Sequence, residues 1–364
     1  MKIRAAVFRD KSGHAEIETL ELEDPREDEI LVRMVAVGVC HTDIKVSTSD
    51  MSPRPIVLGH EGAGIVERVG SRVSKVAAGD HVVMTYDACG HCPSCLANQR
   101  TYCDEVGPRS FGGLRPDGTT PLSRNGTRIA GRFFGQSSFA SYALGYERNV
   151  VKVPKDAPLD LLGPLGCGLQ TGAGAVINAL KMGVGQSIAV FGTGSVGLSA
   201  VMAARLMGAA RIIAVDVLPN RLQMARELGA TDTVNANSED ALQAVSRITG
   251  RGADFTLDTT GVGSVIQQAV ACLAPLGTAG FVASPAEPVA IPIRHLMLGG
   301  RKLRGIVEGE SIPDLFIPLL VEFQRQGRFA LERLVKFYPF ERINEAIHDS
   351  ESGATIKPIL RMTT

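Results

Sequence analysis

The sequence lacks three features that would direct the chain to a nucleic acid or a membrane. It has no net charge, because 38 Lys and Arg residues balance 38 Asp and Glu residues, so no electrostatic field exists to hold a polyanion. Residues 1–9 contain no apolar core of the length that a signal peptide needs. The 23 uncharged residues 182–204 are long enough to suggest a membrane span, but five glycines divide them into a strand, a turn and a helix start. We therefore expect a cytoplasmic protein that binds neither nucleic acid nor membrane.

The length of 364 residues is too great for one ordinary core and favours two domains. The first third contains short β segments between turn signals, at 30–37, 64–69 and 81–86, a pattern typical of an irregular, mostly antiparallel domain. Residues 107–132, rich in glycine, proline, threonine and arginine, are expected to form one long irregular connection. There is no internal repeat.

From about Leu169 the pattern changes to strands alternating with helices, which predicts an α/β domain with a parallel sheet covered on both faces. The expected strands are 187–191, 211–215, 254–258, 278–282 and 302–306. The expected helices are 196–207, 221–228, 240–249 and 264–273. A helix at 313–326 and a final strand at 355–360 form a tail that can rejoin the first domain.

A dinucleotide site is predicted where the 187–191 strand enters a glycine-rich turn and a helix. The turn has the GxGxxG pattern, with Gly192, Gly194 and Gly197 and with Val196 among the intervening residues. The glycines permit a tight turn, close approach of a pyrophosphate and close packing of helix on strand, and the helix amino terminus faces the phosphates. The alternative is a plain glycine turn.

Asp216 specifies which dinucleotide this site is expected to take. It ends the next predicted strand, 19 residues after Gly197, where a carboxylate can accept hydrogen bonds from both adenosine ribose hydroxyls and repel the 2′-phosphate of NADP. NAD is therefore expected, although Asp216 can also serve only as a helix cap. Arg221 can reach the ribose or simply lie in solvent.

Four of the seven cysteines, Cys89, Cys92, Cys95 and Cys103, lie within fifteen residues. With no export signal, this spacing indicates a metal site rather than disulfides. Four sulfurs without an imidazole or an open position describe a closed structural zinc site; an iron–sulfur cluster is the alternative, although the spacing is not that of a ferredoxin. His91, inside this lobe, is expected to face solvent.

Cys40, His60 and Cys167 are scattered along the first domain, and each taken alone is more often a buried core residue than a ligand. Their neighbours favour ligation: Cys40 precedes His41-Thr42-Asp43, His60 lies in Gly-His-Glu-Gly, and Cys167 lies between two glycines. Two thiolates and one imidazole would leave a fourth position of a zinc ion open for water or substrate.

Six motifs in this order resemble the zinc-dependent medium-chain alcohol dehydrogenases over essentially the whole chain. They are Cys40-His41-Thr42-Asp43, Gly59-His60-Glu61, Gly79-Asp80-His81-Val82, the four-cysteine lobe, Gly166-Cys167-Gly168 and Gly192 to Gly197. Within that family, residues 133–139 and 163–174 resemble the aryl (benzyl) alcohol dehydrogenase branch.

The resemblance implies an architecture of two domains. Residues 1–168 and 308–364 would form a GroES-like β domain, with the structural zinc lobe at 87–105, and residues 169–307 a Rossmann domain that binds NAD. It also implies two zinc ions in each chain and a homo-oligomer, with a dimer favoured and a tetramer possible.

The same resemblance implies a role for each motif residue. Cys40, His60 and Cys167 would hold the catalytic zinc, Asp43 would orient His60, and Glu61 would lie behind the metal as a transient ligand. Thr42 would take the alcohol proton. His41 and Lys357 would approach the cofactor phosphates.

One departure concerns the proton relay, because Lys45 stands where liver-type relatives have a histidine. A free lysine titrates near 10.4, so either Lys45 or bulk water could complete the relay. Phe133 and Phe134 are interpreted either as the wall of a pocket for an aromatic ring or as two core residues.

The expected function is hydride transfer between a primary alcohol, aryl or allylic, and NAD, which gives the aldehyde. Within the same enzyme class, S-(hydroxymethyl)glutathione, aliphatic alcohols and terpenoid alcohols such as geraniol are alternatives, as is a polyol or threonine dehydrogenase. A different class is a non-catalytic protein whose zinc lobe binds a partner or DNA; the absence of NADH formation with any alcohol would favour it.

Overall fold

The computed structural model describes residues 1–362 and divides into two compact units. The first unit contains Met1–Cys167, Ile312–Arg325 and the segment from Leu331 onward; the second contains Gly168–Ser311 and Gln326–Ala330. Gly168, residues 308–311 and Gln326–Ala330, all predicted for the first domain, thus belong to the second unit. For residues 308–311 the reason is close packing, since a Cβ atom added to Gly174 would lie 2.4 Å from the carbonyl oxygen of Gly309.

Short, mostly antiparallel strands build the first unit, as the turn-rich sequence predicted. One sheet has the order β4-β1-β2-β7-β8, and the other has the order β10-β6-β5-β3-β18-β17 with β9 also paired to β3. These strands are β1 (Lys2–Phe8), β2 (Glu16–Leu22), β3 (Glu29–Gly38), β4 (Ile56–Val57), β5 (Glu61–Val69), β6 (His81–Met84), β7 (Leu122–Arg124), β8 (Thr127–Ile129), β9 (Tyr142–Tyr146), β10 (Val150–Lys152), β17 (Val335–Pro339) and β18 (Lys357–Arg361).

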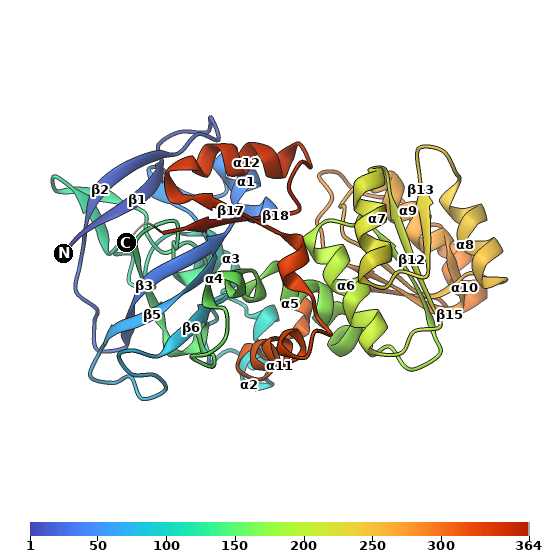
Figure 1. Cartoon of the computed structure of the whole chain (residues 1–364), viewed down its shortest axis with the longest axis horizontal. Coiled ribbons are helices and arrows are strands. Elements are labelled where there is room, and N and C mark those ends of the chain that lie inside the picture. Colours follow the sequence, from blue (N-terminus) through green and yellow to red (C-terminus); the bar gives the residue numbers. More distant parts are fainter. Residues whose placement is uncertain (363–364) are drawn as a thin grey trace. The chain divides into compact units, whose positions relative to one another are not determined.

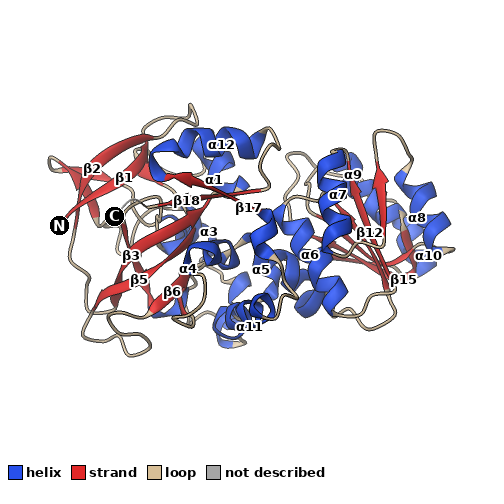
Figure 2. Ribbon diagram, in the orientation of Figure 1, coloured by secondary structure: helices blue, strands red, loops and turns tan. Residues whose placement is uncertain are grey.

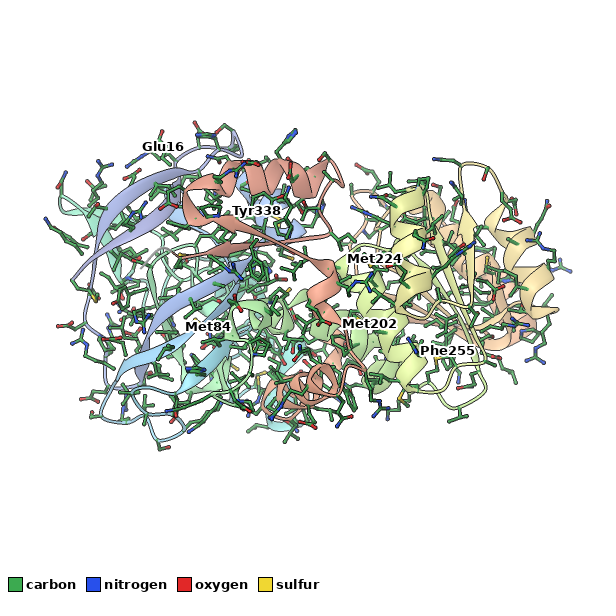
Figure 3. All side chains as sticks on the ribbon, viewed as in Figure 1. Glu16, Met84, Met202, Met224, Phe255 and Tyr338 are labelled. Atoms are coloured by element: carbon green, nitrogen blue, oxygen red, sulfur yellow. The ribbon has the colours of Figure 1, made fainter. Side chains whose placement is uncertain are left out.

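The carboxyl-terminal tail completes the larger of these sheets. Strand β18 pairs antiparallel with β3 and parallel with β17, and helix α12 (Ile343–Glu351) lies beside both strands (Figure 1). In Figure 3 Tyr338 lies beside α12, where its hydroxyl contacts Asp349 and, at 2.9 Å, Thr355. The predicted final strand is confirmed, two residues later than its expected start.

The second unit is a Rossmann domain with six parallel strands. Their order is β13-β12-β11-β14-β15-β16. From β11 the strands are added first toward one edge of the sheet and then, starting with β14, toward the other edge. Such folds bind a ligand at this switch point, beyond the carboxyl ends of the strands. The strands are β11 (Ser187–Phe191), β12 (Arg211–Asp216), β13 (Asp232–Asn235), β14 (Ala253–Asp258), β15 (Leu273–Phe281) and β16 (Lys302–Gly305).

Helices flank this sheet on both faces (Figure 2). They are α6 (Ser195–Leu206), α7 (Pro219–Leu228), α8 (Ala241–Thr249), α9 (Gly263–Ala271) and α10 (Ile293–Gly299), and α5 (Gly168–Gly174) packs on α6. All five strands and four helices predicted for this domain are confirmed, most within two residues at each end. The sequence analysis missed β13 and α10. Both have weak periodicity, since β13 is only four residues long and α10 has no buried residue.

The region 107–132 is more regular than predicted. It contains most of α3 (Val106–Phe111) and the hairpin of β7 and β8, which joins the smaller sheet through β2. Asn125 and Gly126, both with positive φ, form the hairpin turn, and this short turn signal was overlooked among the many polar residues. Among residues 1–362, no helix has both the length and the apolar character needed to cross a bilayer.

Candidate functional site

Three residues far apart in the sequence converge in the first unit. The ligand atoms of Cys40, His60 and Cys167 all lie within 4.8 Å of one another. Cys40 follows β3 and His60 precedes β5, and these strands pair so that Gly38 lies opposite Glu61. Cys167 reaches the same point because Gly166 has no side chain: a Cβ atom there would lie 2.0 Å from the carbonyl oxygen of Met84.

The imidazole of His60 is arranged as a metal ligand would be. Its Nδ1 lies 2.9 Å from Oδ1 of the buried Asp43, while its Nε2 is buried without a hydrogen-bond partner. A proton on Nδ1, donated to the carboxylate, leaves the Nε2 lone pair free to bind a cation. An orphaned, buried nitrogen is costly unless something binds it.

The two thiols complete a donor set that fits zinc. The hydrogen bond with Cys167 lowers the pKa of the Cys40 thiol well below its usual value against the opposing effect of burial. A thiolate is the form that binds a metal. With two sulfurs and one nitrogen, this set would leave a fourth coordination position open, as in zinc sites that perform chemistry.

Asp43 and Gln136 hold the backbone of this cluster in place. Besides His60, Asp43 accepts hydrogen bonds from the backbone N–H groups of Cys40 and Gly59, both at 3.0 Å. The side-chain amide of Gln136 donates to the carbonyl oxygens of His60 (2.8 Å) and Thr85 (3.1 Å). Gln136 was not predicted as a site residue, although it lies within the 133–139 segment on which the branch resemblance rests.

Aromatic side chains cover the imidazole. The ring of Phe134 stacks on His60 with centroids 4.4 Å apart, and the ring of Phe133 meets it edge-on at 5.5 Å. Phe133 is fully buried and Phe134 is 8% exposed. Phe134 has φ +49°, a left-handed conformation that is rare for a bulky residue and that a well-packed environment must stabilise. Both side chains therefore form the immediate apolar wall of the cluster.

A buried ion pair lies behind the cluster. The Nζ of Lys357 is 3.0 and 2.9 Å from the two carboxylate oxygens of Glu61 and 3.1 Å from the carbonyl oxygen of Val39. Burial opposes the charge, but the attraction of Glu61 exceeds it and raises the pKa of Lys357. Lys357 was expected to face cofactor phosphates; the structure buries it beside Glu61 instead, because the pairing of β18 with β3 directs it inward.

The remaining residues of the Cys40 motif lie on α1 (His41–Ser47), the helix that begins after the metal ligand. Thr42 is half-buried one turn from the cluster, whereas His41 and Lys45 are exposed on the helix surface. Lys45 has no contact in the described structure that would link it to Thr42, so its role in a relay stays a prediction.

The four-cysteine lobe forms a second and separate cluster. The sulfur atoms of Cys89, Cys92, Cys95 and Cys103 lie within 4.8 Å of one another. Those of Cys89 and Cys95 are 3.8 Å apart, close to the edge of a tetrahedron built on zinc–sulfur bonds of about 2.3 Å. Helix α2 (Pro93–Leu96) begins inside the lobe and orients two of the cysteines.

Backbone N–H groups aim at these sulfurs, as expected around thiolates. The amide of Cys89 points to Cys103 (3.2 Å) and that of Cys92 points to Cys89 (3.3 Å). Backbone donors, from Asp104 first, lower the pKa of Cys92 to about 6. All four positions are thus supplied by protein, so this site would be closed. His91 is exposed as predicted, with its Nε2 3.2 Å from Glu105.

The glycine-rich turn of the second unit has the geometry that its sequence predicted. A Cβ atom at Gly197 would lie 1.9 Å from the carbonyl oxygen of Gly192, whereas a Cβ atom at Gly194 would meet nothing within 4 Å. Gly197 therefore serves close packing, and Gly194 faces open space at the start of α6, where a phosphate group would fit. Val196 is half-buried on the first turn of α6.

Asp216 ends β12 beside this turn and is held by four donors. Its Oδ2 accepts hydrogen bonds from the backbone N–H (2.6 Å) and the hydroxyl (2.7 Å) of Thr193, and its Oδ1 accepts from the N–H groups of Val217 and Leu218. Arg221 is half-buried on α7, and its Nε is buried without a hydrogen-bond partner. Thr193 was not predicted, because nothing in the GxGxxG pattern specifies its side chain.

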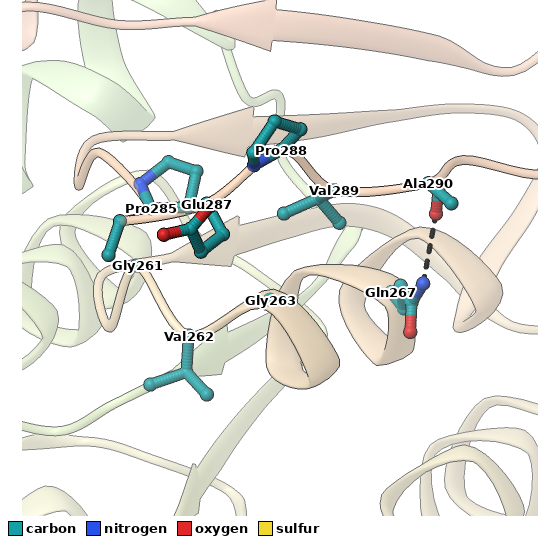
Figure 4. Close-up of a pocket in the computed structure, with 10 residues that line it drawn as sticks. Gly261, Val262, Gly263, Gln267, Pro285, Glu287, Pro288, Val289 and Ala290 are labelled. Atoms are coloured by element: carbon teal, nitrogen blue, oxygen red, sulfur yellow. Dashed lines mark hydrogen bonds between the residues drawn. The ribbon is translucent and has the colours of Figure 1, made fainter.

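A cavity of about 550 Å³ opens at the carboxyl ends of β14 and β15. Residues 261–263 and 285–290 and the side chain of Gln267 line it, and Gln267 is tied to the carbonyl oxygen of Ala290 at 3.0 Å (Figure 4). Its ten lining residues include no cysteine or histidine. The cavity thus lies at the nucleotide-binding edge of this unit, and it offers none of the metal-binding side chains that form the two cysteine clusters.

Comparisons with known proteins identify the family of both domains. Residues 26–155 match the model of the alcohol dehydrogenase GroES-like domain and residues 195–323 match that of the zinc-binding dehydrogenase. The chain is 45% identical over 361 residues to a geraniol dehydrogenase of Castellaniella defragrans, covering 98% of this chain and 97% of the relative.

Two solved structures match the whole chain over their own whole length. One is an alcohol dehydrogenase zinc-binding domain protein from Burkholderia ambifaria, with 52% identity and a TM-score of 0.98. The other is a benzyl alcohol dehydrogenase from Acinetobacter calcoaceticus, with 44% identity and a TM-score of 0.96.

Proposed function

This chain belongs to the zinc-dependent alcohol dehydrogenase family, and on that premise we propose that it moves a hydride between a primary aryl or allylic alcohol and NAD. The aldehyde is the product of oxidation, and the same site can run in reverse. The observation that carries this proposal is the convergence of Cys40, His60 and Cys167, with the buried Nε2 of His60 left without a partner.

The residues of the cluster suggest how the reaction would proceed. Cys40, His60 and Cys167 would hold a zinc ion, which would supply Lewis-acid chemistry and so favour the ionised form of a bound hydroxyl, as it lowers the pKa of water to about 7 in known sites. Asp43 keeps the proton of His60 on Nδ1, and the thiolates balance the charge of the cation. Thr42, half-buried beside the cluster, would accept the alcohol proton and pass it toward solvent.

The coenzyme site supports NAD as the hydride acceptor. Asp216 lies at the carboxyl edge of the sheet with its carboxylate fixed in place, where it can bind ribose hydroxyls and repel a 2′-phosphate. The free Nε of Arg221 and the open space at Gly194 offer a cation and a backbone cradle for the rest of the nucleotide.

Two observations support an aryl or allylic substrate. Two of the three relatives reported above are named for geraniol, an allylic alcohol, and benzyl alcohol. In this chain the ring of Phe134, which is 8% exposed, stacks on the imidazole of His60, and an aromatic ring at this position favours a flat unsaturated substrate over a polar one. The fully buried Phe133 packs behind it as a core residue.

A spectrophotometric assay for NADH formation tests the proposal. We expect benzyl, cinnamyl and geranyl alcohol to give kcat/KM values at least tenfold above that of ethanol, since each buried methylene or aromatic carbon contributes to binding, and NAD to be preferred over NADP. A preference for ethanol or for S-(hydroxymethyl)glutathione would contradict the substrate class. If no alcohol gives NADH or NADPH, the enzymatic proposal fails and a binding role for the zinc lobe replaces it.

We also propose that the protein forms a homodimer and acts in the cytoplasm. Strand β16 lies at the edge of the Rossmann sheet with all four residues exposed, and Met297 and Leu298 of the neighbouring α10 are each 70% exposed. A second copy of β16 could extend the sheet across a two-fold axis and cover these side chains. None of the seven cysteines, all within residues 1–362, forms a disulfide, as expected in a reducing compartment.

The oligomer is tested by light scattering on the eluting protein. Met297→Glu should convert a dimer to a monomer, because it places a charge at the centre of an isologous contact. Glu287→Gln, a change of similar size in a loop of the same unit, should not. A parent protein that is already monomeric would overturn this proposal.

A further inference from the structure

The carboxylate of Asp216 is fixed from both of its oxygens. Two backbone N–H groups hold Oδ1, at 2.7 and 3.0 Å, and both donors of Thr193 hold Oδ2, at 2.6 and 2.7 Å. The Thr193 hydroxyl is the only side-chain donor among these four bonds. It is therefore the one donor of the four that a side-chain substitution can remove while the backbone donors and Asp216 stay in place.

The side chain of Thr193 is not accessible to a coenzyme. Thr193 is fully buried, whereas 8% of the surface of Asp216 is exposed. A ribose could thus contact Asp216 and could not contact the Thr193 side chain. Any influence of the Thr193 hydroxyl on coenzyme binding must pass through the position and charge of the carboxylate.

We propose that Thr193 is a positioning residue that sets coenzyme selectivity by locking the carboxylate of Asp216 at the ribose site. This inference rests on the proposed use of NAD. A locked carboxylate presents its charge in one direction, so it binds a ribose diol well and cannot turn away from a 2′-phosphate. A carboxylate free to rotate would lose part of both effects, and selectivity would fall even with Asp216 present.

The same unit contains a matched arrangement that serves as a control. Ser187 donates both its N–H (2.9 Å) and its hydroxyl (2.8 Å) to one oxygen of Asp254. This pair lies where β11 and β14 begin, at the amino-terminal edge of the sheet, whereas dinucleotides bind at the carboxyl edge. Ser187→Ala therefore removes the same kind of hydrogen bond without touching the site of selectivity.

The experiment measures equilibrium binding of NADH and NADPH to the purified protein by the fluorescence of the reduced nicotinamide, without alcohol or turnover. We expect Thr193→Val to lower the ratio of NADH to NADPH affinity about tenfold, as for loss of one hydrogen bond to a charged acceptor. Thr193→Ser, which keeps the hydroxyl, and Ser187→Ala should stay within about twofold of the parent ratio. Thermal unfolding of each variant shows whether it is folded, and Thr193→Ala replaces the valine variant if that one is not.

Each outcome has a distinct meaning. If Thr193→Val and Thr193→Ala both keep the parent ratio, the role of Thr193 is overturned. The same holds if Thr193→Ser loses selectivity as much as Thr193→Val, because the methyl packing would then be responsible, or if Ser187→Ala lowers the ratio equally. A parent protein that binds NADPH more tightly than NADH would instead overturn the proposed coenzyme.

Discussion

The two cysteine clusters of the first unit differ in where their residues come from and in how many donors they offer. The lobe takes four sulfurs from one short segment, residues 89–103. The cluster of Cys40, His60 and Cys167 takes three donors from segments up to 127 residues apart, since 167 − 40 = 127. A closed set of four stabilises a loop, whereas an incomplete set leaves room for a reactant.

The surroundings of the two clusters differ in the same sense. Backbone N–H groups donate to the sulfurs of the lobe. These donors are uncharged, and the folded loop holds them in position. Around the three-residue cluster stand side chains of opposite charge, Asp43 beside His60 and Lys357 beside Glu61. Buried charges are expensive to hold, and their concentration at one point indicates a place where charge changes during a reaction.

The sharpest test of this difference removes one ligand from the three-residue cluster. Cys167→Ser should lower kcat/KM for benzyl alcohol by about a thousandfold or more, since it removes the Lewis acid of the reaction, and should reduce bound zinc from two ions to one in each chain. The melting temperature should change little. Elemental analysis and the NADH assay measure both effects.

Cys272→Ser is the matched control for that variant. Cys272 is buried in the second unit, where burial raises the pKa of its thiol to about 12, and it belongs to neither cluster. It should keep both zinc ions and parental activity. Parental activity in Cys167→Ser itself would end the assignment of the three-residue cluster as the catalytic centre.

The buried ion pair provides the next largest effect. Lys357→Met leaves the carboxylate of Glu61 buried without its partner, and such a loss costs about 3–5 kcal/mol of the free energy of unfolding. Lys357→Arg, which keeps the charge, should recover most of it. Glu61 raises the pKa of Lys357 above its ordinary 10.5, and burial raises the pKa of Glu61. The ion pair therefore contributes fully only at a pH above the raised pKa of Glu61 and below 10.5, and it is lost as the pH falls through the first value or rises through the raised pKa of Lys357.

Urea unfolding at pH 8 measures this contribution. If Lys357→Met is as stable as the parent there, then Glu61 is not held as a charged group by Lys357, and the contrast between the charged surroundings of one cluster and the backbone surroundings of the other disappears.

The lobe should respond in stability rather than in chemistry. Cys95→Ser should lose one zinc ion and about 3 kcal/mol of stability, typical of a lost metal site, which lowers the melting temperature by roughly 6–12 °C for a unit of this size. The activity of the protein that remains folded should stay within about twofold of the parent. A thousandfold loss of kcat in folded Cys95→Ser would show that the two clusters are not functionally distinct.

The same contrast explains what the sequence could predict. Local spacing was enough for the lobe, the glycine-rich turn and five of the six strands of the Rossmann sheet, because neighbouring residues determine turns, periodicity and ligand geometry directly. The three-residue cluster needed the family motifs as well, since spacing cannot show that β3, β5 and the 163–167 turn meet. Neither spacing nor the family motifs predicted the contacts of three further residues, because those contacts follow from strand register and tertiary packing. They are the contacts of Lys357 with Glu61, Gln136 with His60 and Thr193 with Asp216.

The smallest expected effect is on zinc affinity, when Asp43 beside the three-residue cluster is changed. Asp43→Asn keeps the shape of the side chain but not its charge, so it weakens the orientation of His60 while leaving all three ligands in place. Loss of such a carboxylate lowers metal affinity about 10- to 100-fold.

In a titration with a competing chelator, one zinc ion of Asp43→Asn should leave at a lower chelator concentration than in the parent. The second ion, held by the lobe, should leave at the parental concentration and so serves as an internal control. If both ions shift together, Asp43 acts on the fold as a whole; if neither shifts, the hydrogen bond at 2.9 Å between Asp43 and His60 does not tune the metal.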